Sequence, residues 1–209
     1  MIKPAFTWSD GNAKMSNMKA LSFPMPAVLT CPGAGACKTN CYATQGRYQC
    51  PSVQRLRLRN FVKARDILAR FGAAKLTQIL SADLLLYHRF KIIRVHDSGD
   101  FWRQDYLDAW QDVIKGLKDR RFYCYTKSHQ LDWSRTPPNF SVVHSFGSSM
   151  DHLINTRRPH SRVFRSMNEL LDAGYTPGFG TDAPALGGVR RVGLVYHGTR
   201  KLIENGFVR

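Results

Sequence analysis

The 209-residue chain has no long apolar run and few acidic residues. No stretch of eighteen consecutive apolar residues occurs, so the sequence predicts no membrane-spanning helix and no membrane partner. The N-terminal residues lack the apolar core of a secretory signal, and we therefore expect a cytoplasmic protein. In that reducing compartment, five cysteines are more typical of metal ligands, reactive thiols or core positions than of disulfides.

Basic residues outnumber acidic residues, with 31 Lys and Arg against 15 Asp and Glu and a formal net charge of +16. A chain this basic attracts polyanions, and nucleic acid is the first candidate partner. The sequence has no helix-turn-helix, zinc-finger or RNA-recognition signature, which argues against sequence-specific readout. The arginines that carry most of this expectation are Arg55, Arg57, Arg59, Arg157, Arg158, Arg162, Arg190 and Arg191.

Strand-like and helix-like segments alternate along most of the chain. Helices are expected over 52–71, over about 74–88 and over 103–117, and Gly72 follows the first of them. Strands are expected over 92–96, 121–127, 140–146 and 190–198. Alternation of this kind predicts an α/β fold with a largely parallel sheet and helices outside it. We expect one domain over residues 1–209, with an irregular segment at 1–20.

The length of the chain favours a partial barrel. Roughly six βα units are expected, whereas a closed eight-unit barrel needs about 250 residues. The predicted fold is therefore a partial (β/α)6-type barrel, with a doubly wound open sheet as the alternative. A loop over residues 31–51, rich in cysteine and glycine, is expected to follow the first strand.

Three cysteines, Cys31, Cys37 and Cys41, fall within eleven residues of this loop. Small residues among them let the backbone wrap closely enough for three thiolates to converge on a metal. A structural zinc site usually has four ligands, often in C-x2-C pairs, and no such pair occurs. We therefore expect an iron–sulfur cluster, with zinc as the alternative and Cys50 as the candidate fourth ligand. Cys124 is expected in the core.

A second candidate site follows the strand expected at 92–96. Polar and ionisable side chains at the carboxyl end of a parallel strand usually face a ligand. The alternative is that Asp97 or Ser98 only caps the helix that follows. Lys127 and His144 end the next two expected strands and can reach the same edge. The residues of the segment are His96, Asp97, Ser98, Gly99 and Asp100.

The stretch TCPGAGACKTNCYATQGRYQCPSVQ, together with HDSGDF, resembles the uncharacterised phage and plasmid family known as Gene product 88. The resemblance covers most of the chain, from about Leu21 to Gly198. It implies no activity, because none is established for that family.

The cysteine loop and expected barrel also resemble the radical S-adenosylmethionine enzymes. That resemblance implies a [4Fe–4S] cluster on Cys31, Cys37 and Cys41, S-adenosylmethionine on its open iron, Tyr42 beside the adenine, and an electron donor. The spacing departs from the usual C-x3-C-x2-C, and no Gly-Gly-Glu run follows the second strand. HDSGD stands in that place, and its carboxylates would receive the ammonium of the cofactor.

Two functions are thus expected from the sequence. The leading one is a [4Fe–4S] enzyme of radical S-adenosylmethionine type. In it, His96, Asp97 and Asp100 are catalytic, and the cofactor-binding residues are Tyr42, Asp97, Ser98, Gly99, Asp100, Lys127 and His144. The alternative is a basic nucleic-acid-binding protein in which the cysteines hold a structural metal.

Overall fold

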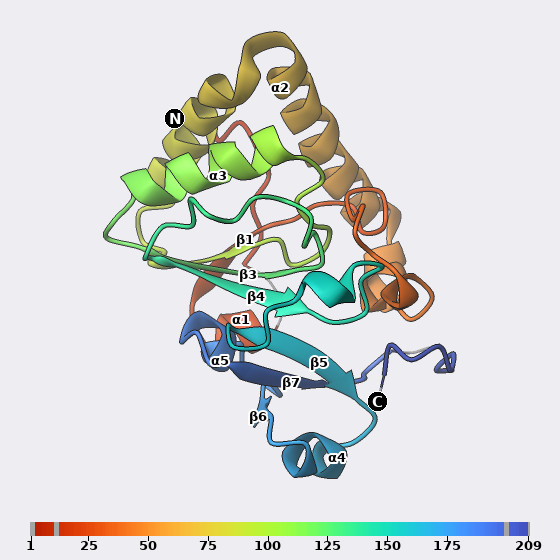
Figure 1. The fold of residues 1–209 in the computed structure, drawn as a ribbon. Helices are drawn as coiled ribbons and strands as arrows, with labels where there is room; N and C mark the ends of the chain where they lie inside the picture. Colours follow the sequence, from red (N-terminus) through yellow and green to blue (C-terminus); the bar gives the residue numbers. More distant parts are fainter. Residues whose placement is uncertain (1–2, 11–12, 199–200, 209) are drawn as a thin grey trace.

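Seven parallel strands form one sheet in the order β1-β2-β3-β4-β5-β7-β6 in the computed structural model, which describes residues 3–10, 13–198 and 201–208 (Figure 1). Parts of the predicted domain and of its N-terminal segment fall outside these ranges. The strands are β1 (Ala20–Phe23), β2 (Ile92–Val95), β3 (Arg121–Thr126), β4 (Phe140–Ser145), β5 (His160–Phe164), β6 (Thr176–Pro177) and β7 (Arg191–Val195).

Among the described residues, one α-helix precedes β1, and four α-helices and four short 3₁₀ turns lie between the strands. The helices are α1 (Ala13–Ser16), α2 (Pro51–Leu86), α3 (Gln104–Gly116), α4 (Met167–Asp172) and α5 (Ala183–Leu186). The 3₁₀ turns are η1 (Ala36–Lys38), η2 (Tyr42–Thr44), η3 (Gly46–Gln49) and η4 (Asp151–Leu153). Three of the 3₁₀ turns lie in the cysteine loop, which therefore has local order of its own.

The helix α2 consists of two arms that meet at Gly72 (Figure 1). Gly72 has a φ of +74°, a left-handed conformation that residues with a side chain rarely adopt. The expected break after Phe71 is thus present, and the second arm runs on to Leu86. The first arm begins at Pro51, one residue before the expected start.

The main core lies between the sheet and the helices α2 and α3, which cover the same face (Figure 1). The apolar stripe predicted for α3 is buried there, with Tyr106 and Trp110 packed among other rings. Trp110 meets Phe23 of β1 edge to face, with ring centroids 5.3 Å apart. Aromatic packing of this kind fixes the sheet against its helices.

The opposite face of the sheet carries polar side chains as well as a smaller apolar cluster. Because β1, β2 and β3 are parallel, Ser22, Arg94 and Tyr123 are in register and share this face. Arg94 is buried and paired with Asp182 at 2.9 Å, and the Tyr123 hydroxyl donates to the same carboxylate.

The predicted α/β fold with a largely parallel sheet is confirmed in coarse form. The strand pairing runs from β1 to β6 and does not close into a ring. The alternation of β-branched and apolar segments with helical stripes was enough to find most elements. Three short ones, α1, β6 and α5, were not expected, because two to four residues carry too little periodicity. None of the described helices is long and apolar enough to cross a membrane.

Candidate functional site

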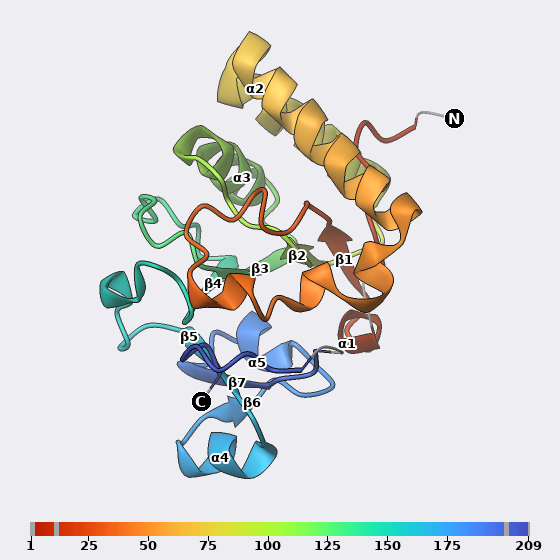
Figure 2. The same ribbon diagram turned by 90° about the vertical axis from the view of Figure 1, so that its right-hand side faces the viewer.

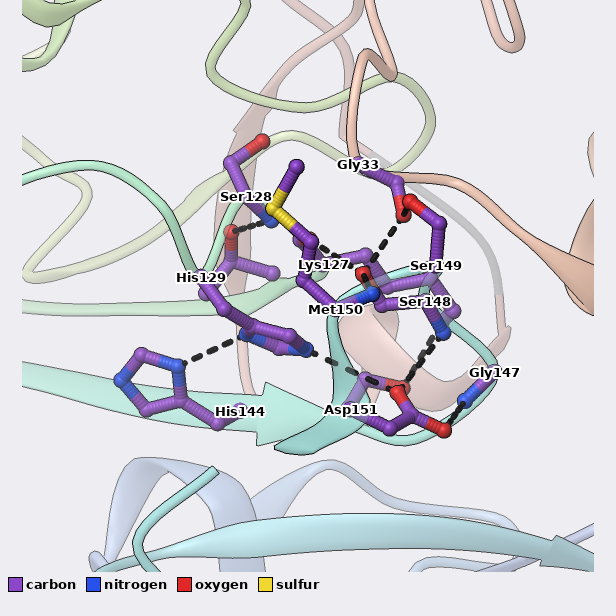
Figure 3. A network of polar contacts seen from close by, with 12 residues as sticks. Gly33, Lys127, Ser128, His129, His144, Gly147, Ser148, Ser149, Met150 and Asp151 are labelled. Atoms are coloured by element: carbon purple, nitrogen blue, oxygen red, sulfur yellow. Dashed lines mark hydrogen bonds and ion pairs between the residues drawn. The ribbon is translucent and has the colours of Figure 1, made fainter. Parts of the chain in front are cut away.

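The cysteine loop is fastened to the carboxyl end of β4 by backbone contacts (Figure 3). The Gly33 carbonyl accepts hydrogen bonds from Ser148 Oγ at 2.6 Å and from the Ser149 amide at 3.0 Å. The Gly147 carbonyl accepts from the amides of Gly35 and Cys37. A Cβ atom on Gly33 would lie 2.0 Å from the Lys127 carbonyl oxygen, so only glycine permits this approach.

The three loop cysteines are close to one another and half-buried. Burial, together with the nearby charges of Asp100, Cys41 and Cys37, raises the pKa of Cys31 to about 12. Burial also raises the pKa of Cys37 and of Cys41. These groups are therefore protonated thiols at neutral pH. All five cysteines are free; Cys50 is exposed, and Cys124 is buried in β3 as expected.

The segment after β2 turns two of its polar residues toward α2. Arg57 of α2 donates from Nη2 to Asp97 at 2.9 Å and from Nε to the Ser98 hydroxyl at 2.7 Å. Tyr42 donates its hydroxyl to the Asp97 carbonyl oxygen. The helix α3 has Arg103 as its N-cap residue without a side-chain cap, so neither Asp97 nor Ser98 has the capping role considered for it.

Asp100 ties the β2 segment to the end of β3. Its carboxylate accepts from the Thr126 hydroxyl at 2.8 Å, the Lys127 amide at 2.7 Å and the Phe101 amide at 2.8 Å. Gly99 has a φ of +78° and lies against Thr30, whose hydroxyl accepts from the Asp100 amide. Burial raises the pKa of Asp100, an effect that these donors oppose. Its bonds hold the fold together; its catalytic role stays a prediction.

His96 lies in the aromatic core. Its ring stacks on Tyr106, and its Nε2 is 2.8 Å from the Tyr106 hydroxyl. Burial, with a smaller contribution from Arg94, lowers its pKa to about 3. His96 is therefore neutral at pH 7, and its surroundings are those of a structural histidine; the predicted catalytic role is untested.

Lys127 and His144 lie at the same edge but bind different partners (Figure 3). Lys127 donates to the Ser145 hydroxyl at 2.8 Å. His144 Nδ1 is 3.1 Å from His129 Nδ1, and His129 Nε2 is 3.9 Å from Asp151. Burial lowers the pKa of each histidine to about 4, so both are neutral at pH 7.

The predicted residues thus gather at one edge, where contacts within the protein satisfy most of their polar atoms. The exceptions include three buried atoms without a hydrogen-bond partner: Arg57 Nη1, Asp97 Oδ1 and, in the aromatic core, His96 Nδ1. Across the described residues, no group of three or more His, Cys, Asp or Glu side chains is arranged to hold a metal ion.

A cleft of about 650 Å³ lies at the other end of the sheet, beside β5, β7 and α4. Aromatic rings and arginines line it, among them Phe146, Arg162, Phe164, Tyr175 and Arg191. The sequence had singled out these arginines as basic surface but none of the rings. The only sequence signal for the cleft was local, because His160, Arg162 and Phe164 alternate along β5 and so share a face.

A family model described as Gene product 88 matches residues 3–203. The chain belongs to the Gene product 88 family. It is 28% identical over 121 residues to the Gene 88 protein of Mycobacterium phage D29, an alignment that covers 56% of this chain and 50% of that protein. It is also 28% identical over 151 residues to the Gene 88 protein of Mycobacterium phage L5, covering 64% and 63%. The chain thus matches less than two thirds of either relative, and no solved structure matches it.

Membership of the Gene product 88 family was expected, but the iron–sulfur enzyme was a wrong prediction. Neither the family model nor the two relatives carry the name of an iron–sulfur or radical S-adenosylmethionine protein. The described side chains also form no metal-binding group, which equally removes the structural metal of the alternative. Dense cysteine spacing indicates proximity, but it does not fix how thiol side chains are directed. Burial also raises the pKa of each of these thiols.

We expect Cys50 to react first with Ellman's reagent at pH 7.5, because it is the only exposed cysteine. The loop cysteines should react slowly, since burial raises the pKa of each and depletes the thiolate. Stopped-flow absorbance should show one fast thiol in the native protein and none in Cys50→Ser. A fast phase that persists in Cys50→Ser would contradict the protonated state of the loop thiols.

The buried His96 should make stability fall in mild acid. Its folded pKa of about 3 lies below the ordinary value of 6.5, so between these pH values the unfolded chain binds a proton that the folded chain does not. Stability is therefore lost as pH falls through this window. From pH 7 to pH 5, urea unfolding should show about 2 kcal/mol less loss in His96→Asn than in wild type. Asparagine tolerates the φ of +73° at this position, and equal losses would contradict a neutral buried His96.

Proposed function

We propose that the protein binds nucleic acid through the arginine-rich end of its sheet. The observation that carries this proposal is the convergence of five arginines from three segments. Arg157 and Arg158 precede β5, Arg162 lies within it, and Arg190 and Arg191 lie at the start of β7. The segments are adjacent because β5 pairs with β7 in parallel, with His160 opposite Arg191.

The charges of these arginines affect neighbouring groups, and no acidic side chain pairs with them. Burial lowers the pKa of His160, and the charges of Arg191, Arg162 and Arg190 lower it further. Among the described residues, none of the five arginines forms an ion pair, whereas Arg65 and Arg135 elsewhere are paired with aspartates. Unpaired arginines presented together are well suited to phosphate groups. The net charge of +16 supports the same partner.

This proposal includes the cytoplasmic location that the sequence predicts. Nucleic acid is present in the cytoplasm, and cysteines remain free in its reducing environment. We also propose that the sheet curves as in a partial (β/α)6-type barrel. Support comes from the polar residues Ser22, Arg94 and Ser161 on its less apolar face, which are all buried.

The arginine-rich end can be tested by salt-dependent binding. Fluorescence anisotropy of a labelled 20-nucleotide DNA should give an affinity that falls linearly with salt on logarithmic axes. The exposed triple variant Arg157→Ala, Arg158→Ala and Arg190→Ala should bind more weakly, with a slope reduced by about two. The matched control removes three exposed arginines of α2, as Arg55→Ala, Arg59→Ala and Arg70→Ala.

The control triple should change the slope less, although both variants lose the same net charge. An equal reduction by the two triples would indicate non-specific attraction and contradict an interface at β5 and β7. A greater reduction by the α2 triple would place the interface on that helix instead. Binding that shows no salt dependence would contradict the proposal altogether.

A second candidate function is the binding of a small polar molecule at the carboxyl edge of β2. It is favoured by Arg57 Nη1 and Asp97 Oδ1, a buried donor and a buried acceptor without partners. Such atoms are costly unless something outside the protein satisfies them. Tyr48, whose ring lies 4.4 Å from the Arg57 guanidinium, and Tyr42 flank the position.

Native mass spectrometry of the protein as purified tests this second candidate. We expect a bound species that is lost on denaturation and absent from Asp97→Asn, in which the carboxylate acceptor becomes an amide. A native mass equal to that of the bare chain, together with full solvent exchange of the Arg57 side chain in NMR spectra, would contradict it.

A further inference from the structure

We propose that the cleft beside β5 and β7 takes one unpaired base of a single-stranded nucleic acid. This inference rests on the proposed function, and it names the class of nucleic acid and the place where a base is held. The cleft has a volume of about 650 Å³, within the range of small-molecule sites. It lies on the same segments as the five arginines, so a strand held by its phosphates passes its bases across the opening.

The floor of the cleft is a row of ring contacts. His160 meets Phe146 at a centroid distance of 5.9 Å and Tyr175 at 5.7 Å, in both cases edge to face. Tyr175 also meets Phe164 at 5.1 Å. Phe164 and His160 are buried, whereas Phe146 and Tyr175 are half-buried and present ring surface to the cleft. The row is held rigidly, which lowers the entropic cost of stacking a ligand on it.

Arg162 supplies a second stacking surface. Its guanidinium carbon lies 3.6 Å from the centroid of the Phe146 ring. At that distance the guanidinium stacks on the ring and is held in place for a further planar group. Arginine planes and aromatic rings are the two surfaces on which proteins stack unpaired bases.

The charges around the cleft determine on which side of it the phosphate groups of the nucleic acid lie. Arg162 and Arg191 line one side of the cleft, and Glu169 and Asp172 of α4 line the other. Phosphate groups are therefore attracted to the side formed by β5 and β7 and repelled from α4. The carboxylates on the α4 side are left as acceptors for the amino groups of a base.

A duplex does not fit this arrangement. Its base faces are covered by their neighbours, so the rings of Phe146 and Tyr175 have no surface to stack against. A single strand presents every base face, and stacking is tolerant of sequence. Preference for single strands without preference for sequence agrees with the lack of a sequence-reading motif.

The test combines anisotropy with a fluorescent base. A 12-nucleotide single strand carrying one 2-aminopurine, made as DNA and as RNA, is compared with a hairpin duplex of the same composition. Tyr175→Leu removes the ring, Tyr175→Phe keeps it, and Phe179→Leu removes an exposed ring that does not line the cleft. Circular dichroism and thermal unfolding confirm that each variant is folded, and Phe146→Leu replaces Tyr175→Leu if the latter is not.

Tyr175→Leu should lower single-strand affinity about ten- to hundredfold, leave the salt slope unchanged and abolish the quenching of 2-aminopurine. Tyr175→Phe and Phe179→Leu should behave as wild type. Binding by either the DNA or the RNA strand supports the inference. Equal affinity for the hairpin, or full quenching in Tyr175→Leu, would overturn the inference. If binding were still salt-dependent in that case, the proposed function would stand. Loss of all salt-dependent binding in the wild type would overturn both.

Discussion

The parallel pairing of β5 with β7 is the interaction on which the proposed interface depends. It joins residues about thirty positions apart and sets His160 opposite Arg191, two positions along each strand from Arg162 and its partner Gly193. The chain between the two strands forms α4, β6 and α5, and residues of α4 line the far side of the cleft. Gly193 of β7 faces Leu170 of α4, and a Cβ there would lie 2.3 Å from that side chain, so glycine sets the close approach of helix and sheet. Without this pairing, neither the arginines nor the rings would share a surface.

The polar groups at the carboxyl edge of β2, β3 and β4 are arranged differently from those beside β5 and β7. There the polar groups bind one another: Asp100 accepts three hydrogen bonds, and Gly33 and Gly147 fasten the cysteine loop to the sheet. Buried networks that are satisfied in this way rigidify a structure. Arg57 Nη1, Asp97 Oδ1 and His96 Nδ1 are buried there without partners, and the first two mark the position proposed for a small polar ligand.

Much of the fold could be predicted because it is encoded locally. The stripe on α3, the break at Gly72 and the β-branched strands each show in a short window of sequence. The cysteine loop was found for the same reason, but its chemistry was misjudged: spacing reveals that thiols are near in the chain, whereas their protonation depends on tertiary burial. The cleft could not be predicted, since Phe146, Arg162 and Tyr175 come from separate elements that only strand pairing and the packing of α4 bring together.

The most direct test of the central claim is to locate the bound strand on the protein. A single strand containing 4-thiouridine can be photocrosslinked to the wild-type protein, digested, and the modified peptides identified by mass spectrometry. We expect crosslinks within the peptides that carry Phe146 and Tyr175, and their loss when an unlabelled single strand competes. Crosslinks confined to α2 or to the cysteine loop, with none at β5, α4 or β7, would contradict it.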